Sequence, residues 1–197
     1  MDLFARISQH FQDSVQTKID AAELLAGPIA EATDLMVHCL LGNGKILVCG
    51  DGSSAAEAQR FTSHLIGRFE RERPELAAIA LAANGTLSTA LAAEYDFSHI
   101  FAKQVRALGQ PHDVLVALCT SGNSQAVLNA IAAAHERDMR VVALTGRGGG
   151  QIGQALHDHD VHLCVPGERA ARVQEVHMLA IHCLCDGIDC MLMGEEP

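Results

Sequence analysis

The sequence predicts an α/β fold in which helices cover both faces of a five-stranded parallel sheet, giving a three-layer sandwich. Short, continuous apolar runs recur along the chain, and most are separated from the next by a stretch long enough for a helix. Such runs are typical of parallel strands buried on both faces, because each crossover lays a helix on the sheet. The length of 197 residues suits one domain of this kind and is short for two.

The chain is expected to begin with two helices over residues 1–42. Apolar residues recur at every fourth position of the first helix, as on one face of an amphipathic helix: Leu3, Ile7, Phe11, Val15 and Ile19. Gly27 and Pro28 are expected to end this helix, because proline fits the first turn of a following one. The second helix would then run to the Gly-Asn-Gly sequence at 42–44.

An α/β core is expected over residues 43–197. Its five apolar runs are the expected strands, and they lie at 45–49, 76–81, 113–118, 139–144 and 160–165. The segment from 169 to 193 carries apolar residues close to the helical repeat and is expected to be one long helix. The acidic end at 194–197 is expected to fray.

The charge of the chain argues against direct binding to nucleic acid or to anionic membranes. There are 24 acidic and 14 basic residues, and the formal net charge is -10. Both kinds of binding need a surface rich in lysine and arginine. The aromatic content of 4%, with no tryptophan, also disfavours a stacking surface for single-stranded nucleic acid.

The cysteines and the amino terminus indicate a cytoplasmic protein. The chain has seven cysteines, an odd number, and no Cys-x-x-Cys pair, so free thiols in a reducing compartment are expected. The first residues do not resemble a secretory signal. No apolar stretch is expected to be long enough to span a bilayer.

Two of the expected strands end in similar loops of small residues. The first loop, residues 50–54, reads Gly-Asp-Gly-Ser-Ser, and the second loop, residues 119–124, reads Cys-Thr-Ser-Gly-Asn-Ser. Loops of this kind before helices present free N–H groups and hydroxyls to an anion, so a phosphorylated ligand is expected. Tight turns with a serine cap are the alternative. A third glycine-rich stretch, residues 146–150, is expected to be a flexible crossover.

Several segments together resemble the sugar isomerase (SIS) family. Besides the two loops they are GRFERERP at 67–74, FAKQVRALG at 101–109, VVALTGRGGG at 141–150 and ARVQEVHMLAIHCLCD at 171–186. Within the family, the chain resembles the group that joins phosphoheptose isomerase with the DnaA initiator-associating protein DiaA. The resemblance covers nearly the whole chain. It implies a homotetramer with sites between subunits, in which the helices of residues 1–42 take part in oligomerisation.

The resemblance implies that a phosphorylated sugar contacts both loops and two further positions. These ligand-binding residues are Asp51, Gly52, Ser53, Glu94, Cys119, Thr120, Ser121, Ser124 and Gln174. Three positions depart from the isomerase pattern. Asp51 replaces an asparagine, Cys119 replaces a serine, and Ala93-Glu94 replaces an Asn-Asp pair. An acid at position 51 repels a nearby phosphate unless it is turned away or protonated.

The catalytic and metal positions depart further from the isomerase pattern. In that pattern one helix supplies histidine and glutamate four residues apart, and the last helix supplies glutamine and histidine, a set that suits zinc. The corresponding residues here are Arg60 and His64, then Gln174 and His182. His64 and His182 are the candidate catalytic residues, and His64, Gln174 and His182 are the candidate zinc ligands. Arg60 opposes a metal, because a guanidinium cannot be a ligand.

Other charged residues have simpler expected roles. His177 is expected to be structural, and Arg68 is expected to form an ion pair near the site entrance. Glu175 is expected to lie near the site beside Gln174. The histidines at 157, 159 and 162 alternate with aspartates; such tracts can recruit metal, but a solvated edge is the preferred interpretation.

Three functional hypotheses remain. The preferred one is a DiaA-like tetramer that binds the initiator DnaA with isomerase activity weak or lost, and in which Leu192 and Met193 form an apolar contact with the partner. The alternative is a sedoheptulose 7-phosphate isomerase in which His64 and His182 transfer the proton, with or without zinc. A sugar-phosphate-responsive regulator is the third.

Overall fold

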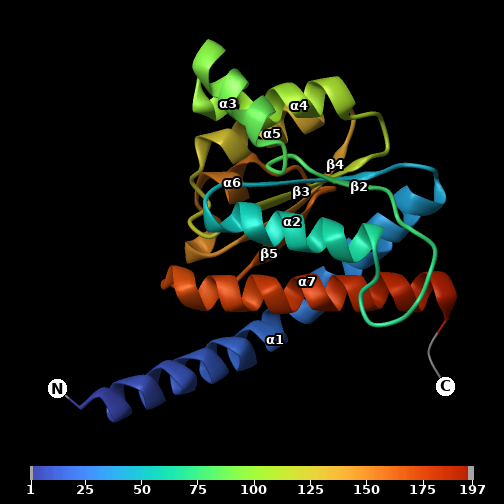
Figure 1. Ribbon diagram of the computed structural model, residues 1–197. Coiled ribbons are helices and arrows are strands. Elements are labelled where there is room, and N and C mark those ends of the chain that lie inside the picture. The colour runs from blue at the N-terminus through green and yellow to red at the C-terminus, as the bar shows by residue number, and fades with distance from the viewer. Residues whose placement is uncertain (1, 195–197) are drawn as a thin grey trace.

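The computed structural model describes residues 2–194, and its centre is a five-stranded parallel sheet (Figure 1). The strands lie in the order β2-β1-β3-β4-β5. Their bounds are Ile46–Gly50 for β1, Ala78–Ala80 for β2, Val114–Cys119 for β3, Arg140–Thr145 for β4 and Val161–Cys164 for β5. The predicted α/β class and all five strands are confirmed. The predicted fraying of residues 195–197 lies outside the described residues.

Helices form a layer on each face of the sheet (Figure 1). One layer holds α1 (Leu3–Leu41), α2 (Ser53–Ile66) and α7 (Ala170–Met193). The other holds α3 (Gly85–Glu94), α4 (Ile100–Leu108), α5 (Gln125–His135) and α6 (Gly150–Ala155), with the short 3-10 helices η1 (Phe97–His99) and η2 (Arg147–Gly149). Successive residues of β1 serve the two cores in turn: Val48 packs with Phe61 of α2, and Leu47 packs with Phe101 of α4.

Helix α1 differs from the two helices that the sequence predicts. It runs unbroken from Leu3 to Leu41 with Pro28 inside it, so the predicted break is wrong. Proline costs the helix one hydrogen bond at this point. The residues on both sides of it nevertheless pack into the core, among them Leu25 and Met36, and this burial holds the helix together. The amino-terminal half extends away from the body of the molecule (Figure 1).

The expectation that no segment is long and apolar enough to cross a membrane is also wrong. By length and composition alone, α1 and α7 both qualify, each with a window of mean hydropathy 1.4. Helix α7 packs along α1 and against the sheet, so its apolar residues serve the core. The local sequence pattern does not show that such a long apolar helix lies in the core of the fold.

The strand order fixes where a ligand can bind. From β1 the chain passes to β2 on one side, and it then returns to place β3 on the other side of β1. The loops after β1 and β3 therefore diverge at a topological switch point, beyond the carboxyl ends of the strands. Open α/β sheets bind their ligands in this crevice. The first and second loops both lie here.

Candidate functional site

A hydrogen bond joins the first and second loops. The hydroxyl of Ser124 donates to Oδ2 of Asp51 at 2.5 Å and also accepts from the backbone N–H of Val127, which caps α5. The acid at position 51 is thus turned toward the second loop. In this arrangement Ser124 uses its hydroxyl within the protein, although the resemblance assigns it to the ligand.

The amino terminus of α2 is open to an anion. Gly52 precedes the helix with φ 55 and ψ -125, a conformation that suits glycine, and no side chain caps the helix there. Ser53 is exposed at the first helical position. Unpaired N–H groups and the helix dipole favour a phosphate at such a terminus.

The second loop presents its hydroxyls above a buried thiol. Thr120 and Ser121 are half-buried, whereas Cys119 is 4% exposed and its sulfur contacts the hydroxyl of Ser121 at 3.5 Å. Burial raises the pKa of the neighbouring Cys49 thiol, and the charges of Asp51 and Cys119 raise it further. Both thiols at the strand ends are buried, whereas the half-buried Thr120 and Ser121 are the residues of this loop that can reach a ligand with a hydroxyl.

The glycine-rich stretch at 146–150 supports the second loop and is not the flexible crossover that the sequence predicts. Gly122 has φ +69, and a Cβ atom there would lie 2.1 Å from the carbonyl oxygen of Gly149. The N–H of Ile152 donates to the carbonyl of Gly122 at 2.9 Å. Two backbones in direct contact fix the second loop in place, and only glycine permits this approach.

His64 and His182 lie together, as the sequence predicts, with Phe69 beside them. The ring centroids of the two histidines are 5.9 Å apart, and Phe69 lies 5.3 Å from His64 and 5.5 Å from His182. Nε2 of His64 is buried and has no hydrogen-bond partner among residues 2–194. We call His64 and His182 the histidine pair.

The surroundings of His182 keep its imidazole neutral. Partial burial lowers the pKa of His182 below the ordinary value of 6.5, and the positive charges of His64 and Arg60 lower it further, while Glu70 opposes this. Arg60 itself is exposed on α2. Its charge therefore acts on the histidine pair from the solvent side.

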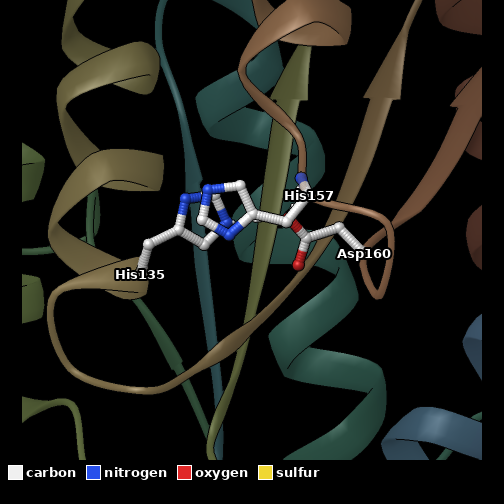
Figure 2. Close-up of side chains that lie close together, drawn as sticks. All are labelled: His135, His157 and Asp160. Atoms are coloured by element: carbon white, nitrogen blue, oxygen red, sulfur yellow. Dashed lines mark hydrogen bonds and ion pairs between the residues drawn. The ribbon is translucent and has the colours of Figure 1, made fainter.

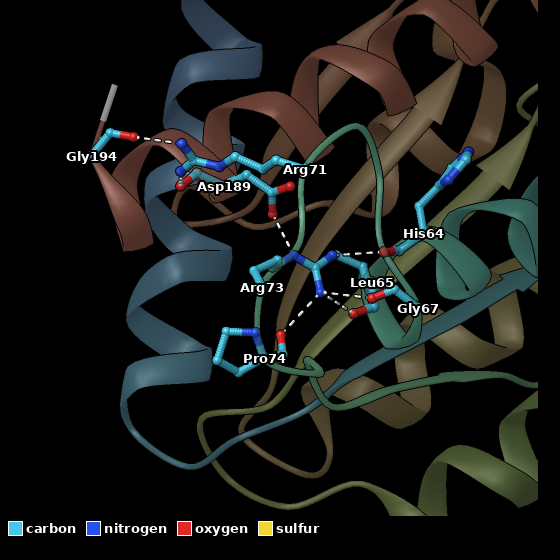
Figure 3. A network of polar contacts seen from close by, with 8 residues as sticks. All are labelled: His64, Leu65, Gly67, Arg71, Arg73, Pro74, Asp189 and Gly194. Carbon is cyan, nitrogen blue, oxygen red and sulfur yellow. Dashed lines mark hydrogen bonds and ion pairs between the residues drawn. The ribbon is translucent and has the colours of Figure 1, made fainter. Parts of the chain in front are cut away.

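A buried ion pair fixes the carboxyl end of α2, which carries His64 (Figure 3). The guanidinium of Arg73 pairs with Asp189 of α7 at 2.6 Å, and the two side chains are 0% and 5% exposed. Arg73 also donates to backbone carbonyls around the end of α2, those of His64, Leu65, Gly67 and Pro74. The neighbouring Arg71 donates to the carbonyls of Asp189 and Gly194. The roles of Arg71 and Arg73 were not predicted from the sequence. The charged run at 70–73, directly before Pro74, was the local feature that could have indicated them.

A second buried pair links α2 to α7. His177 is 1% exposed, and its Nε2 lies 3.1 Å from the carbonyl oxygen of Thr145, so this nitrogen carries a proton. Its Nδ1 faces Oε2 of Glu57 at 3.8 Å, and neither atom has a hydrogen-bond partner among residues 2–194. The role of Glu57 was also missed from the sequence.

Four other predicted positions lie elsewhere or contact the protein itself. Gln174 is half-buried on α7. Glu175 faces α1, where it accepts from Ser14 at 2.6 Å and pairs with Arg172, so its predicted place near the site is wrong. Glu94 is exposed at the end of α3. Leu192 is half-buried against the core, and the neighbouring Met193 is exposed at the end of α7.

The donor set at the histidine pair does not fit zinc. Zinc takes three or four nitrogen, sulfur or oxygen ligands around one point. Among residues 2–194, no third histidine, cysteine or carboxylate completes such a group at His64 and His182. The charge of Arg60, which lowers the pKa of His182, stands beside the place where a cation would bind.

The loops and the histidine pair are two separate parts of the site. Eleven residues of α2 separate Ser53 from His64, or roughly 16 Å of helix. No hydrogen bond among residues 2–194 joins either histidine to the loops through its side chain. One chain therefore holds two half-sites, one suited to an anion and one suited to proton transfer.

The fold and the two loops define an α/β protein with a candidate ligand site at the switch point, and comparison with known proteins names the class. Residues 10–146 match the SIS domain family. The chain belongs to this family. A solved phosphoheptose isomerase from Neisseria gonorrhoeae superposes with a TM-score of 0.91 at 50% identity, covering 95% of this chain and 98% of that one.

Close relatives over the full length of the chain are phosphoheptose isomerases. One from Azoarcus sp. (strain BH72) is 61% identical over 196 residues, which is 100% of both chains. A solved phosphoheptose isomerase from Francisella tularensis has a TM-score of 0.93 at 47% identity, covering 96% of this chain and 99% of that one.

These relatives correct the preferred hypothesis of the sequence analysis. A DiaA-like regulator that binds DnaA is wrong, because the full-length relatives at high identity are named as isomerases. The replacements at Arg60 and His64 suggested a lost activity, whereas the rest of the chain is similar to the isomerases. Two substituted positions do not by themselves distinguish a lost activity from a changed set of catalytic side chains.

Proposed function

We propose that the protein is an aldose–ketose isomerase that converts sedoheptulose 7-phosphate to the corresponding aldose phosphate in the cytoplasm. The observation that carries this proposal is the 61% identity, over the full length, with a phosphoheptose isomerase. Two loops suited to a phosphate at the switch point and a pair of adjacent histidines agree with it. Seven free cysteines agree with a reducing compartment.

The loops bind and orient the phosphate of the sugar. The open amino terminus of α2 at Ser53 and the hydroxyls of Thr120 and Ser121 supply donors to its oxygens. The carboxylate of Asp51 opposes the phosphate charge, and its hydrogen bond to Ser124 keeps it directed at the second loop. Binding of the sugar therefore depends more on N–H groups and hydroxyls than on positive side chains.

The histidine pair moves the proton. Neutral His182 removes a proton from C1 of the ketose, and the C1–C2 bond becomes the double bond of an enediolate. The positive charge of Arg60 stabilises the oxyanion that develops. A guanidinium can do this although it cannot be a zinc ligand. The proton returns to C2 from His182 or from His64, while the hydroxyl proton moves from the oxygen on C1 to the oxygen on C2. The product is the aldose, with all atoms retained.

The working unit is an oligomer, for which a homotetramer is the expected form. The exposed side of α1 carries a row of large apolar side chains, which water disfavours in a monomer: Leu3, Phe4, Ile7, Phe11, Val15 and Ile19. Roughly 16 Å of helix separates the loops from the histidine pair of the same chain. A second copy that places its histidine pair against these loops completes one site around one sugar.

Turnover of the ketose tests the proposal. Purified protein incubated with sedoheptulose 7-phosphate and a metal chelator should yield the aldose phosphate, which is detected by chromatography. His182→Ala and His64→Ala should each lose at least about 100-fold in kcat, whereas His38→Ala, an exposed histidine on α1, should not change it. Absence of turnover both with the chelator and with added zinc would contradict the isomerase. Turnover only with zinc would contradict the metal-free mechanism.

A further inference from the structure

Three histidines and an aspartate gather at the edge of the sheet that lies opposite the loops. His135 is the last residue of α5, and His157, His159 and Asp160 come directly before β5. Because β5 is parallel to the other strands, its beginning lies at the amino-terminal edge of the sheet, whereas the loops follow the carboxyl ends of β1 and β3. In the sequence, only His157, His159 and Asp160 lie close together, whereas His135 belongs to a different segment.

The side chains of the cluster are in contact with one another (Figure 2). Nε2 of His135 lies 2.7 Å from Oδ2 of Asp160. The ring of His157 stacks on that of His135, with centroids 3.7 Å apart and planes 14° from parallel, and the ring of His159 lies 5.5 Å from that of His157. One ligand atom from each of His135, His157 and Asp160 lies within 4.8 Å of the others.

Half of the cluster is buried and hydrogen-bonded, and half is exposed. The Asp160 side chain is 0% exposed, and its oxygens accept from the backbone N–H groups of Val141 and His157 at 2.9 Å. The His135 side chain is 13% exposed and points at this carboxylate. His157 and His159 are exposed in the turn before the strand. The cluster thus combines a buried carboxylate and a fixed imidazole with two exposed imidazoles beside them.

We propose that His135, His157, His159 and Asp160 bind a divalent transition-metal ion such as Zn²⁺ or Co²⁺. Imidazole nitrogen and carboxylate oxygen suit these ions, whereas Mg²⁺ and Ca²⁺ prefer oxygen alone. On binding, the ion replaces the proton that Nε2 of His135 shares with Asp160. The nitrogen lone pairs of stacked rings point in parallel, so His157 leaves the stack and turns its ring toward the ion.

The position of the cluster favours a cation. His135 ends α5, and the carboxyl end of a helix carries partial negative charge. The carboxylate of Asp160 adds a full charge that is shielded from water. A bound ion ties the end of α5 to the beginning of β5, and it stabilises the folded chain because the unfolded chain lacks the site. This site is distinct from the histidine pair and does not depend on the proposed isomerase activity.

The test uses the full chain carrying His64→Ala and His182→Ala, so that the candidate catalytic histidines take up no metal. Co²⁺ is added at pH 7.5 and its visible absorption is followed, and Zn²⁺ binding is measured by calorimetry. We expect one equivalent per chain, an absorption band of tetrahedral Co²⁺ and a higher Tm with Zn²⁺. Adding His157→Ala with His159→Ala should weaken binding at least tenfold and abolish the rise in Tm.

The control is His38→Ala in the same background. His38 is also exposed and faces an aspartate, Asp34, at 3.3 Å, but no further histidine accompanies this pair among the ligand groups of residues 2–194. It should bind metal as its parent does. Because His157 and His159 are exposed, their replacement should leave the circular dichroism and the metal-free Tm unchanged. No uptake of either metal, or uptake that survives both replacements, would overturn the proposal.

Discussion

Ser124 donates a hydrogen bond of 2.5 Å to Asp51 and so connects the loops that leave the sheet on either side of its switch point. This hydrogen bond explains how the acidic side chain of Asp51 is accommodated beside a loop that is expected to bind a phosphate. The carboxylate is directed at the second loop, where the hydroxyl of Ser124 donates to one of its oxygens. The charge remains close to the place where a phosphate is expected to bind.

Asp51→Asn should improve binding of the phosphate. The amide oxygen still accepts from Ser124, while the negative charge is removed. A unit charge near 5 Å in water-like surroundings contributes about 1 kcal/mol, so KM should fall about fivefold with little change in kcat. Steady-state kinetics and calorimetry with inorganic phosphate measure this. Asp51→Ala, which leaves the hydroxyl of Ser124 without its acceptor, is the companion variant; a higher KM in Asp51→Asn would contradict the prediction.

Arg60→Gln should raise the pKa of His182. The guanidinium is one of three influences that hold this pKa below 6.5, after burial and the charge of His64. Its removal moves the pKa upward, though not to the ordinary value. The ring proton signals of His182, followed by NMR through pH 4 to 8, report the change, and the acidic limb of kcat/KM should move to higher pH with them. Arg68→Gln, which alters an exposed pair with Glu72, is the control; equal titration curves in wild type and Arg60→Gln would refute the assignment.

Arg73→Met should destabilise the protein severely. It leaves the carboxylate of Asp189 buried without its ion-pair partner and removes the donor to the carbonyl of His64. Breaking a buried pair in this way costs about 3–5 kcal/mol, measured as the free energy of unfolding in urea. Arg73→Lys keeps the charge but not the geometry, so its free energy of unfolding should lie between those of the wild type and Arg73→Met. Arg106→Gln, in a half-exposed pair with Glu136, should leave the urea midpoint nearly unchanged, and a similar loss in both variants would show that burial is not the cause.

Charges on the exposed row of α1 should break the oligomer. Phe11 and Val15 are 71% and 56% exposed in the single chain, so replacing both with aspartate costs a monomer little. At a subunit interface the same charges lose water without gaining partners. Light scattering after gel filtration should show a smaller mass than that of the wild type, together with lost turnover. Gln12→Asp, a polar change on the same helix, should keep the wild-type mass; an unchanged mass in the double variant would argue against this interface.

The fold could be predicted from the sequence because burial on both faces leaves a local signal. Each of the five apolar runs became a strand, and the closing helix Ala170–Met193 starts one residue after its predicted start and ends where it was predicted to end. The continuity of α1 through Pro28 could not be predicted in the same way. It rests on contacts with α7, which lies far along the chain, and tertiary packing overrides a local breaker.

The site could be predicted only in part, for the same reason. The two loops follow from residue types at recognisable positions after strands, and the histidine pair follows from the resemblance to the SIS family. Arg73 with Asp189 and His135 with Asp160 are partners separated by 116 and 25 residues, and nothing local to either member indicates the other. Pairing across a fold depends on which elements meet. A buried aspartate therefore looks the same in sequence as a solvated one.

In the proposed oligomer, the long first helix links the folding of this chain to its concentration. All residues of α1 that are buried in the single chain lie from Ala21 onward, and the contacts of its first 18 residues with their own domain include polar pairs such as that of Ser14 with Glu175. An isolated helix of that length is marginal in water. In the proposed oligomer another copy covers these residues, so dilution should loosen this part of the helix and separate the subunits in one coupled equilibrium.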